Sequence, residues 1–599
     1  MKNNNWFYLK IASFVAFLII VIRQCFYYIF SGDIWWYLAV GKYILSAHRI
    51  LKTEIFSFSA PGYPWIDQTW LAEVIFYCVY QINGFAALNV FKILIITAVF
   101  LVLFKVCLIR KASFFPAILA VLLAVLFARG NEFFGVRSYL FTYILGALYL
   151  LFLYGYKSSK NKFWLFGASG IMLLWVNSHG GFIYGFIFSG AFLIEEFINM
   201  LKNKKSDFTV IGIFFTVNLL ITLVNPWGYQ VWNVLQLLKS GASEFTLMEW
   251  KKPQIFGDWL KYFIYLCFVN ILYLLNRGKK VSDFVILLAL DYLFLLAIRN
   301  TPIFAMFTAP VLAVSINDLI SRVKSVNLDR LKRIEKPASA VIIIILIIYS
   351  FFVFRGMNIH YLSQEMELFP KDGAAFLKAN EFSSNIFNPY EWGGYLTFNL
   401  YPQYRVYIDG RFSCYPPEVY EDYISILRGE KNWQALLDKY NVNIIMLTNL
   451  RERITPVFES NISKSIDWKK VYRDELCAIF IKSSELKKES KILYPESYYI
   501  YVVAGENAFR KKDYATAEKL LKKALGIYPR SSRAMINLGT VLCVQGKEDE
   551  GVELFKEAVI ISPVADIVHY NLGRYYLKKG DLKKSKKRIL ERTGVKSRI

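Results

Sequence analysis

Apolar runs of membrane length recur through the first 354 residues, and they constrain the fold more than any other feature of the chain. A bilayer core of about 30 Å is crossed by a helix of about 20 apolar residues, and runs near that length follow one another from Trp6 to Phe354. Of all 599 residues, 56% are hydrophobic and only 20% are charged. The sequence therefore predicts a polytopic α-helical membrane protein with about eleven transmembrane helices.

The first run follows Lys2 and Lys10 and has no small-residue cleavage site after it, so we interpret it as an uncleaved signal anchor. Each later run is bounded by polar or charged residues that mark the ends of a helix. The later spans are expected near residues 85–109, 114–128, 139–155, 163–176, 182–201, 208–224, 262–275, 281–298, 303–320 and 340–354.

Basic residues indicate how these spans are oriented. The turns on the starting side carry basic clusters at residues 110–111, 157–162, 202–205, 277–280 and 322–336. Because Lys and Arg accumulate in cytoplasmic loops, this pattern predicts a cytoplasmic N-terminus and an extracytoplasmic C-terminal third. The same clusters account for much of the formal net charge of +25, so nucleic acid is not an expected partner.

A polar and aromatic segment follows the first span and is expected to lie on the outer surface, at residues 31–84. Its stretch 34–45 has helical periodicity and contains the adjacent Trp35 and Trp36, as expected of an interfacial helix with rings at headgroup depth. Pro61, Gly62 and Pro64 separate it from a second helix near Thr69. We therefore treat residues 1–354 as one transmembrane domain with a long outer loop.

Two water-soluble parts are predicted after the last span. Residues 355–485 have the mixed pattern of a small α/β domain, with helices at 372–379 and 433–440 and strands at 406–408, 443–447 and 478–481. In residues 495–599, Gly505, Gly539 and Gly573 recur every 34 residues, as do Ala524 and Ala558. This is the period of tetratricopeptide (TPR) repeats, which stack helix pairs into a solenoid. A protein partner bound through these repeats is the corresponding expectation.

Polar residues at the outer ends of different helices are the candidate site. They are Asp33, His48, Asp67, Glu73, Arg129, Glu132, Arg137, His179, Asn225, Glu249 and Arg299. Arginine on the outer side runs against the usual loop bias, and a planar guanidinium binds phosphate oxygens through two hydrogen bonds. We therefore expect a lipid phosphate or diphosphate as ligand. The alternative is that these arginines pair with neighbouring acids to hold the bundle together.

A family resemblance rests on this layout and on several motifs. A first span, an acid at its outer boundary, a long interfacial loop, many further spans and an outer soluble domain together resemble the GT-C superfamily of membrane glycosyltransferases. The motifs GDIWWYLAVGKYIL, FSFSAPGYPWIDQTWLAEVIFY, NPWGY, EWKKP, RNTPIF and NPYEWGGYL with VYIDGR resemble an uncharacterised bacterial family of such proteins with appended TPR repeats. The resemblance implies a polyprenyl-phosphate-linked sugar donor, a bacterial plasma-membrane location and a function in the cell envelope.

The resemblance also implies roles for particular residues. Asp33 takes the place of the catalytic acid or base of the first outer loop, and Arg137 and Arg299 would stabilise the leaving phosphate. His179, in VNSHGG, is a candidate ligand of sugar or phosphate, or else a helix-end histidine satisfied by its neighbours. The full set of expected substrate-binding residues is Arg137, Arg299, His179, Asp67, Glu73, Arg129, Glu249, Trp392, Asp409 and Arg411.

Metal binding is not expected, and neither is any other cofactor. Related enzymes often carry two close acids in this loop, whereas Asp33 is followed by Ile34 and Trp35 and stands alone. A divalent cation would need oxygen ligands from Asp33 and Asp67, with Glu73 or Glu132 added.

The segments NPYEWGGYL and YIDGR partly resemble the acceptor-contacting region of oligosaccharyltransferases. By that likeness Trp392, Asp409 and Arg411 would shape an acceptor surface. The alternative is that Gly393 with Gly394, and Asp409 with Gly410, only form turns.

Three functions compete at this point. The first is glycosyl transfer from a polyprenyl-phosphate carrier to an extracytoplasmic acceptor. The second is a non-enzymatic membrane scaffold whose repeats organise an envelope complex. A transporter is disfavoured because the sequence has no repeated halves with matching interrupted helices.

Overall fold

The computed structural model describes most of the chain. The described residues are 2–25, 32–128, 135–233, 251–255, 259–326, 369–380, 382, 385–448, 456–474, 476–486, 498–529, 531–561 and 566–586. They fall into two compact units. The first comprises described residues within Met1–Glu367, Tyr390–Phe398 and Ile408–Val419, and the second those within Leu368–Pro389, Asn399–Tyr407 and Tyr420–Ile599. Two short segments from beyond residue 354 thus belong with the helical unit.

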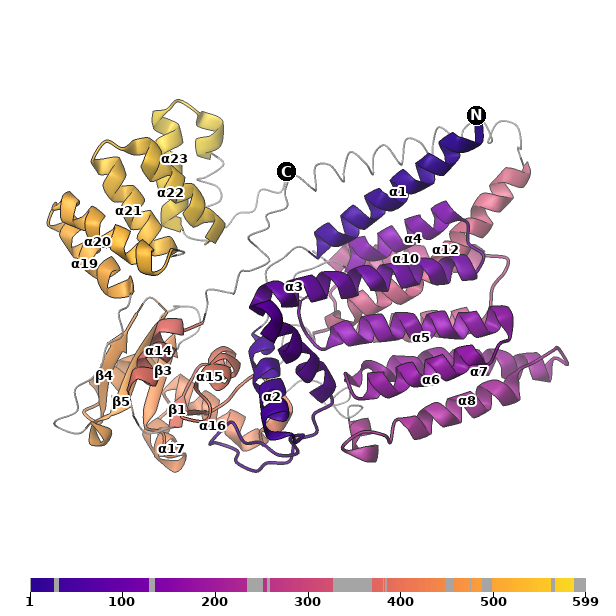
Figure 1. Ribbon diagram of the computed structural model, residues 1–599, viewed down its shortest axis with the longest axis horizontal. Helices are drawn as coiled ribbons and strands as arrows, with labels where there is room; N and C mark the ends of the chain where they lie inside the picture. Colours follow the sequence, from indigo (N-terminus) through magenta and orange to yellow (C-terminus); the bar gives the residue numbers. More distant parts are fainter. Residues whose placement is uncertain are drawn as a thin grey trace. The chain divides into compact units, whose positions relative to one another are not determined.

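The first unit is a bundle of apolar helices. Its principal helices are α1 (Lys2–Gln24), α2 (Asp33–Ala47), α3 (Trp70–Ile109), α4 (Phe114–Ala128), α5 (Tyr139–Ser159), α6 (Phe163–Val176), α7 (Ile183–Leu201), α8 (Phe208–Ile221), α10 (Leu260–Leu275), α11 (Val281–Leu296) and α12 (Thr301–Val326). Helices α5 to α8 lie side by side, and α12 packs against α4 (Figure 1). Small residues permit close packing, since Gly146 of α5 meets Trp175 and Phe307.

Four described helices are long and apolar enough to cross a membrane. They are Trp70–Ile109, Tyr139–Ser159, Gly180–Leu201 and Ile298–Arg322. Shorter apolar helices, α4, α6, α8 and α10, accompany them. These findings support a membrane protein, while the expected number of about eleven spans stays a prediction. The span expected at 340–354 lies outside the described residues.

Helix α3 differs from the sequence expectation in an instructive way. A helix from Thr69 and a separate span from Phe85 were expected, but the structure has one helix of 40 residues that is interrupted at Asn83 and Gly84. Gly84 has a φ of 54°, a left-handed conformation that glycine adopts without steric cost. Two helical directions are therefore joined at this point without a loop.

Ion pairs hold together the end of the bundle where the basic clusters lie. Buried Arg110 pairs with Asp283 at 2.5 Å, and Asp283 also accepts a hydrogen bond from Tyr154 at 3.1 Å. Lys157 pairs with Glu195 at 2.9 Å. Basic residues at the C-terminal ends of α3 and α5 thus meet acids of α7 and α11 at a common end of the helices. Which side of the membrane this end faces stays a prediction.

The second unit contains a five-stranded mixed sheet and the C-terminal helices. The strands are β1 (Asn385–Phe387), β2 (Arg405–Val406), β3 (Ile444–Thr448), β4 (Trp468–Arg473) and β5 (Cys477–Lys482), in the order β2-β1-β3-β5-β4. The pairs of β1 with β2 and β3 are parallel, and those of β5 with β3 and β4 are antiparallel. Helices α14 (Lys371–Ala379) and α17 (Trp433–Lys439) occur where the sequence predicted them.

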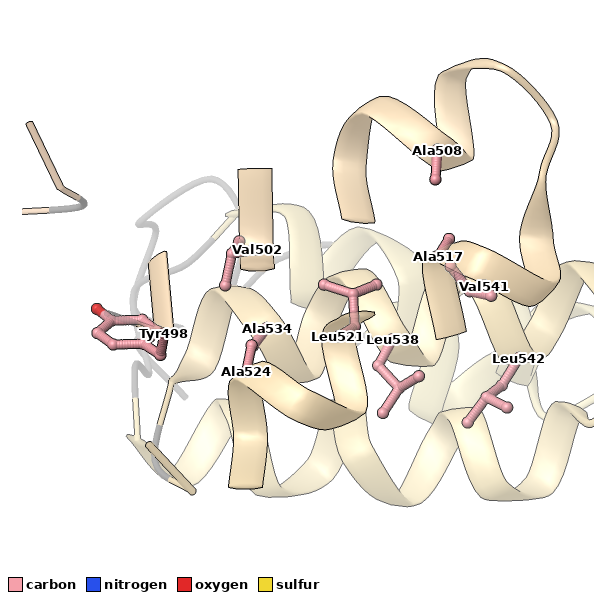
Figure 2. Close-up of a cluster of buried hydrophobic side chains, with 10 residues drawn as sticks. All are labelled: Tyr498, Val502, Ala508, Ala517, Leu521, Ala524, Ala534, Leu538, Val541 and Leu542. Carbon is pink, nitrogen blue, oxygen red and sulfur yellow. The ribbon is translucent and has the colours of Figure 1, made fainter. Parts of the chain in front are cut away.

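The repeat region forms paired helices around small residues. Helices α19 (Tyr498–Arg510), α20 (Tyr514–Ile527), α21 (Ser532–Val544), α22 (Glu548–Ile561) and α23 (Asp566–Lys578) follow one another. A Cβ at Gly505 would lie 2.7 Å from Leu521, and one at Gly539 would lie 2.7 Å from Phe555. The periodic glycines therefore allow close approach within each helix pair. Figure 2 shows the buried cluster that includes Leu521 and Leu538.

Candidate active site

Asp33 begins helix α2 and forms an ion pair across the bundle. Its Oδ2 lies 2.8 Å from Nη2 of Arg137, which precedes helix α5. Both side chains are partly accessible, with 30% of Asp33 and 21% of Arg137 exposed. A carboxylate in the first turn of a helix also interacts favourably with the helix dipole. Next to this pair, the hydroxyl groups of Tyr37 and Ser138 are hydrogen bonded at 3.1 Å.

His179 is held in one tautomer by its neighbours. Its Nδ1 accepts a hydrogen bond from the backbone N–H of Gly181 at 3.0 Å and lies 2.7 Å from Oγ1 of Thr142. That oxygen accepts a hydrogen bond from Nε1 of Trp175, which leaves its own proton for Nδ1. The proton of the neutral imidazole must then be on Nε2.

The charge state of His179 follows from its surroundings. Burial and the nearby Arg299 charge lower the pKa of His179 to about 3. The imidazole is therefore neutral at physiological pH and offers Nε2–H as a hydrogen-bond donor. Nε2 has no hydrogen-bond partner among the described residues, so this donor is available to a ligand.

Loops from distant parts of the chain meet at this end of the bundle. The backbone N–H of Leu71 donates to the carbonyl of Asn177 at 3.2 Å. Nε1 of Trp227, in the NPWGY motif, donates to the carbonyl of Trp65 at 3.0 Å. The outer loop, the loop that carries His179 and the NPWGY turn are therefore neighbours.

Asp67 and Glu73 are buried in the outer loop and are bridged by Thr69. Oδ1 of Asp67 accepts from the backbone N–H of Thr69 at 2.9 Å, and Oε1 of Glu73 lies 2.6 Å from the Thr69 hydroxyl. Burial raises the pKa of Asp67. Both side chains are almost fully covered, at 1% and 0% exposure, so they shape the loop and expose no surface to a ligand in this structure.

Asp409 and Arg411 form a second buried charge cluster with Glu54. Nη1 of Arg411 lies 2.7 Å from Oε2 of Glu54, and its Nη2 lies 2.6 Å from Oδ2 of Asp409. Burial lowers the pKa of Arg411, but Asp409 and Glu54 outweigh it and raise this pKa above its ordinary value. Arg411 and Asp409 bind protein groups rather than face solvent, and Trp392 is equally buried. Sequence reasoning missed Glu54, because no feature distinguishes it from a surface acid.

Two glycines of the NPYEWGGYL segment approach other backbone closely. Gly393 and Gly394 begin helix α15 (Gly393–Leu400), so they do not form the turn offered as an alternative. A Cβ at Gly393 would lie 2.6 Å from Cα of Asp409, and one at Gly394 would lie 3.0 Å from the backbone nitrogen of Trp36. The segment therefore packs on helix α2 next to Asp33.

The remaining candidates are only partly placed. Arg299 lies in the short helix η5 (Ile298–Asn300), and its neighbour Asn300 accepts a hydrogen bond from Tyr184 at 2.9 Å. Arg129, Glu132 and Glu249 lie outside the described residues. In the described part of the chain, no three His, Cys, Asp or Glu side chains are grouped as metal ligands. Asp33 is paired with Arg137, and Oδ1 of Asp67 and Oε1 of Glu73 contact Thr69.

No protein-family model matches the chain. No curated protein matches it either. Solved structures do match it. The Archaeoglobus fulgidus oligosaccharyltransferase AglB, in complex with an inhibitory peptide and a dolichol-phosphate, has a TM-score of 0.51 and 11% identity over 74% of this chain and 70% of that chain. The apo form of the Archaeoglobus fulgidus oligosaccharyltransferase has a TM-score of 0.52 and 12% identity over 73% and 69%.

These likenesses concern the fold alone, which is similar to that of the archaeal oligosaccharyltransferase over about three quarters of this chain. A further match, MamA, has 21% identity and a TM-score of 0.16, and it covers 16% of this chain. The chain spans little more than half of MamA, 57%.

Proposed function

We propose that this protein is a membrane glycosyltransferase that moves a sugar from a polyprenyl-phosphate carrier to an acceptor outside the cytoplasm. The observation that carries the proposal is the partly exposed Asp33–Arg137 pair, at 2.8 Å, within a fold shared with oligosaccharyltransferases. A fold alone hosts many activities, so the site has to carry the argument.

The chemistry needs a base and fixed positive charge. The acceptor hydroxyl loses its proton as it attacks the anomeric carbon, and a carboxylate within hydrogen-bond reach can take that proton. Asp33 has this role in the proposal. The bond to the carrier phosphate breaks in the same step, and the negative charge that develops on the phosphate is stabilised by cations already in place. Arg137 and Arg299 supply them, and His179 adds a neutral N–H donor.

The ion pair also suggests how donor binding prepares the base. Arg137 is held by Asp33 at 2.8 Å in this structure. A carrier phosphate offers the same guanidinium more acceptor oxygens and more charge than one carboxylate does. In the proposal the phosphate takes over Arg137, and Asp33 is released to bind the acceptor hydroxyl.

The remaining expectations belong to the same proposal. The chain would cross a bacterial plasma membrane about eleven times, with its N-terminus in the cytoplasm and the site on the opposite face. The paired helices from α19 to α23 would bind a protein, because stacked repeats present an extended surface. The sugar would come from a lipid carrier without a metal cofactor.

The test is a donor-cleavage assay with matched variants. Purified full-length protein is incubated with labelled polyprenyl-phospho-sugars, and release of polyprenyl phosphate is followed. Asp33→Asn should lower the release rate by about 100-fold to 10,000-fold, the range typical of losing a general base. Asp438→Asn is the control, since Asp438 is 62% exposed and pairs with Lys482 at the surface. Equal release by wild type and Asp33→Asn would contradict the proposal.

The second candidate is a non-enzymatic scaffold, and one observation favours it. The bundle already uses ion pairs as structural contacts, as Arg110 with Asp283 shows, and the Asp33–Arg137 pair would be another. Under this reading Asp33→Asn lowers the thermal stability of the protein, and no donor is cleaved by either form.

A further inference from the structure

Arg411 connects two loops that are more than 340 residues apart in the sequence. Its guanidinium lies 2.7 Å from Glu54 of the outer loop and 2.6 Å from Asp409 of its own loop. Nε of Arg411 also donates to both Asp409 oxygens at 3.0 Å. The side chain is 1% exposed. Nε and Nη2 thus donate hydrogen bonds to Asp409, and Nη1 forms an ion pair with Glu54.

The partners of Arg411 are fixed in turn by the backbone. Oε1 of Glu54 accepts from the backbone N–H groups of Phe56 and Ser57, both at 2.6 Å. The guanidinium carbon lies 4.9 Å from the centre of the Phe56 ring and 5.1 Å from that of Trp65. Such a desolvated cluster contributes little net stability compared with apolar residues. Its contacts tie the loop of Asp409 and Arg411 to the outer loop at Glu54.

The loop that is tied in this way carries Gly410, between Asp409 and Arg411. A Cβ at Gly410 would lie 3.0 Å from Oδ1 of Asp33 and 3.1 Å from Nε1 of Trp36. Gly410 therefore rests directly on the first turn of helix α2. The loop limits where the Asp33 carboxylate and the Trp36 indole can move.

We propose that Arg411 is a positioning residue for Asp33: with Glu54 and Asp409 it holds Gly410 against the first turn of helix α2 and so fixes the carboxylate. The inference rests on the proposed function only for its kinetic consequence. Its geometric consequence can be measured whether or not the protein transfers a sugar.

The geometric test is a crosslinking rate. Full-length protein carrying Asp33→Cys and Gly410→Cys is oxidised, and the linked peptides are quantified by mass spectrometry, which separates them from links made by the seven native cysteines. The Cβ position of residue 410 lies 3.0 Å from Oδ1 of Asp33, so the two introduced thiols are neighbours. Adding Arg411→Ala should slow crosslinking at least 10-fold. Adding Arg428→Ala is the control, because the Arg428 side chain is 61% exposed and its ion pair with Glu430 is at the surface; it should leave the rate unchanged.

A second variant covers the case in which Arg411→Ala does not fold. Arg411→Lys keeps the positive charge but cannot contact both carboxylates through a planar fork, so it should slow crosslinking by less than Arg411→Ala. A crosslinking rate equal to that of the parent in either folded Arg411 variant overturns the proposal. In the donor-cleavage assay, Arg411→Lys should lower kcat more than it changes KM. If no donor is cleaved but crosslinking depends on Arg411, the proposed function fails and the positioning role stands.

Discussion

Gly393→Ala should destabilise the protein although it adds a single methyl group. The new Cβ would lie 2.5 Å from Cβ and 2.6 Å from Cα of Asp409, and closer still to the carbonyl oxygen of Ile408. Two of these three atoms belong to the backbone, so no side-chain rotation relieves the overlap, and the two segments must separate. Overpacking of this kind costs about 1 to 3 kcal/mol, and we expect a value near the upper end.

The assay is thermal unfolding of the purified protein followed by the fluorescence of its 14 tryptophans. A cost of about 2 to 3 kcal/mol corresponds to a Tm lower by roughly 2 to 4 °C, because the entropy of unfolding grows with the size of the unit. Gly170→Ala is the matched control: nothing lies within 4 Å of its Cβ position in helix α6, and alanine is the better helix former by up to about 1 kcal/mol. Its Tm should be unchanged or slightly higher. Equal Tm values for the two variants would refute the packing argument.

Three further changes have defined outcomes. Leu521→Ala removes a fully buried side chain of the repeat core and should lower the free energy of unfolding of the repeats by about 2 to 5 kcal/mol. Amide hydrogen exchange should become faster in α19 and α20 and stay unchanged in the sheet. Burial and the neighbouring Asp474 charge raise the pKa of Asp372 to about 6. Between about pH 4 and pH 6 the folded state therefore keeps a proton that the unfolded state has lost, and the free energy of unfolding falls as the pH rises. Asp372→Asn should abolish this part of the pH dependence of Tm. Since the pKa of His179 is about 3, the pH profile of donor cleavage between pH 5 and 8 should be the same for wild type and His179→Gln.

The sequence predicted the features that appear as a local periodic pattern of residues. The 34-residue spacing of Gly505 and Gly539 is explained by the structure, because each glycine admits a large side chain of the paired helix. Polarity at helix ends also brought Asp33 and Arg137 into one predicted site, and the structure places them 2.8 Å apart. Both inferences needed only short-range pattern and the two-sided geometry of a membrane.

The features that sequence could not predict depend on contacts over long distances in the chain. Polarity predicts exposure for Asp409 and Arg411, yet these residues are buried because Glu54, far away in the sequence, neutralises the arginine. A charged residue that is satisfied by one distant partner has the same local pattern as a solvated one. The roles of Gly393 and Gly394 were missed for a related reason, since close approach to another segment leaves no periodic signal.

The completeness of the site therefore depends on residues beyond the helical bundle. Removing the repeats, residues 495–599, takes away buried clusters that are built entirely from repeat residues. Removing everything after residue 389 takes away Asp409, Gly410 and Arg411 as well, and it leaves the Glu54 carboxylate without its cation. We expect the first truncation to retain donor cleavage and the Tm of the helical unit, and the second to lose both. Donor cleavage by the shorter protein would mean that Asp33 needs no support from the loop at Gly410.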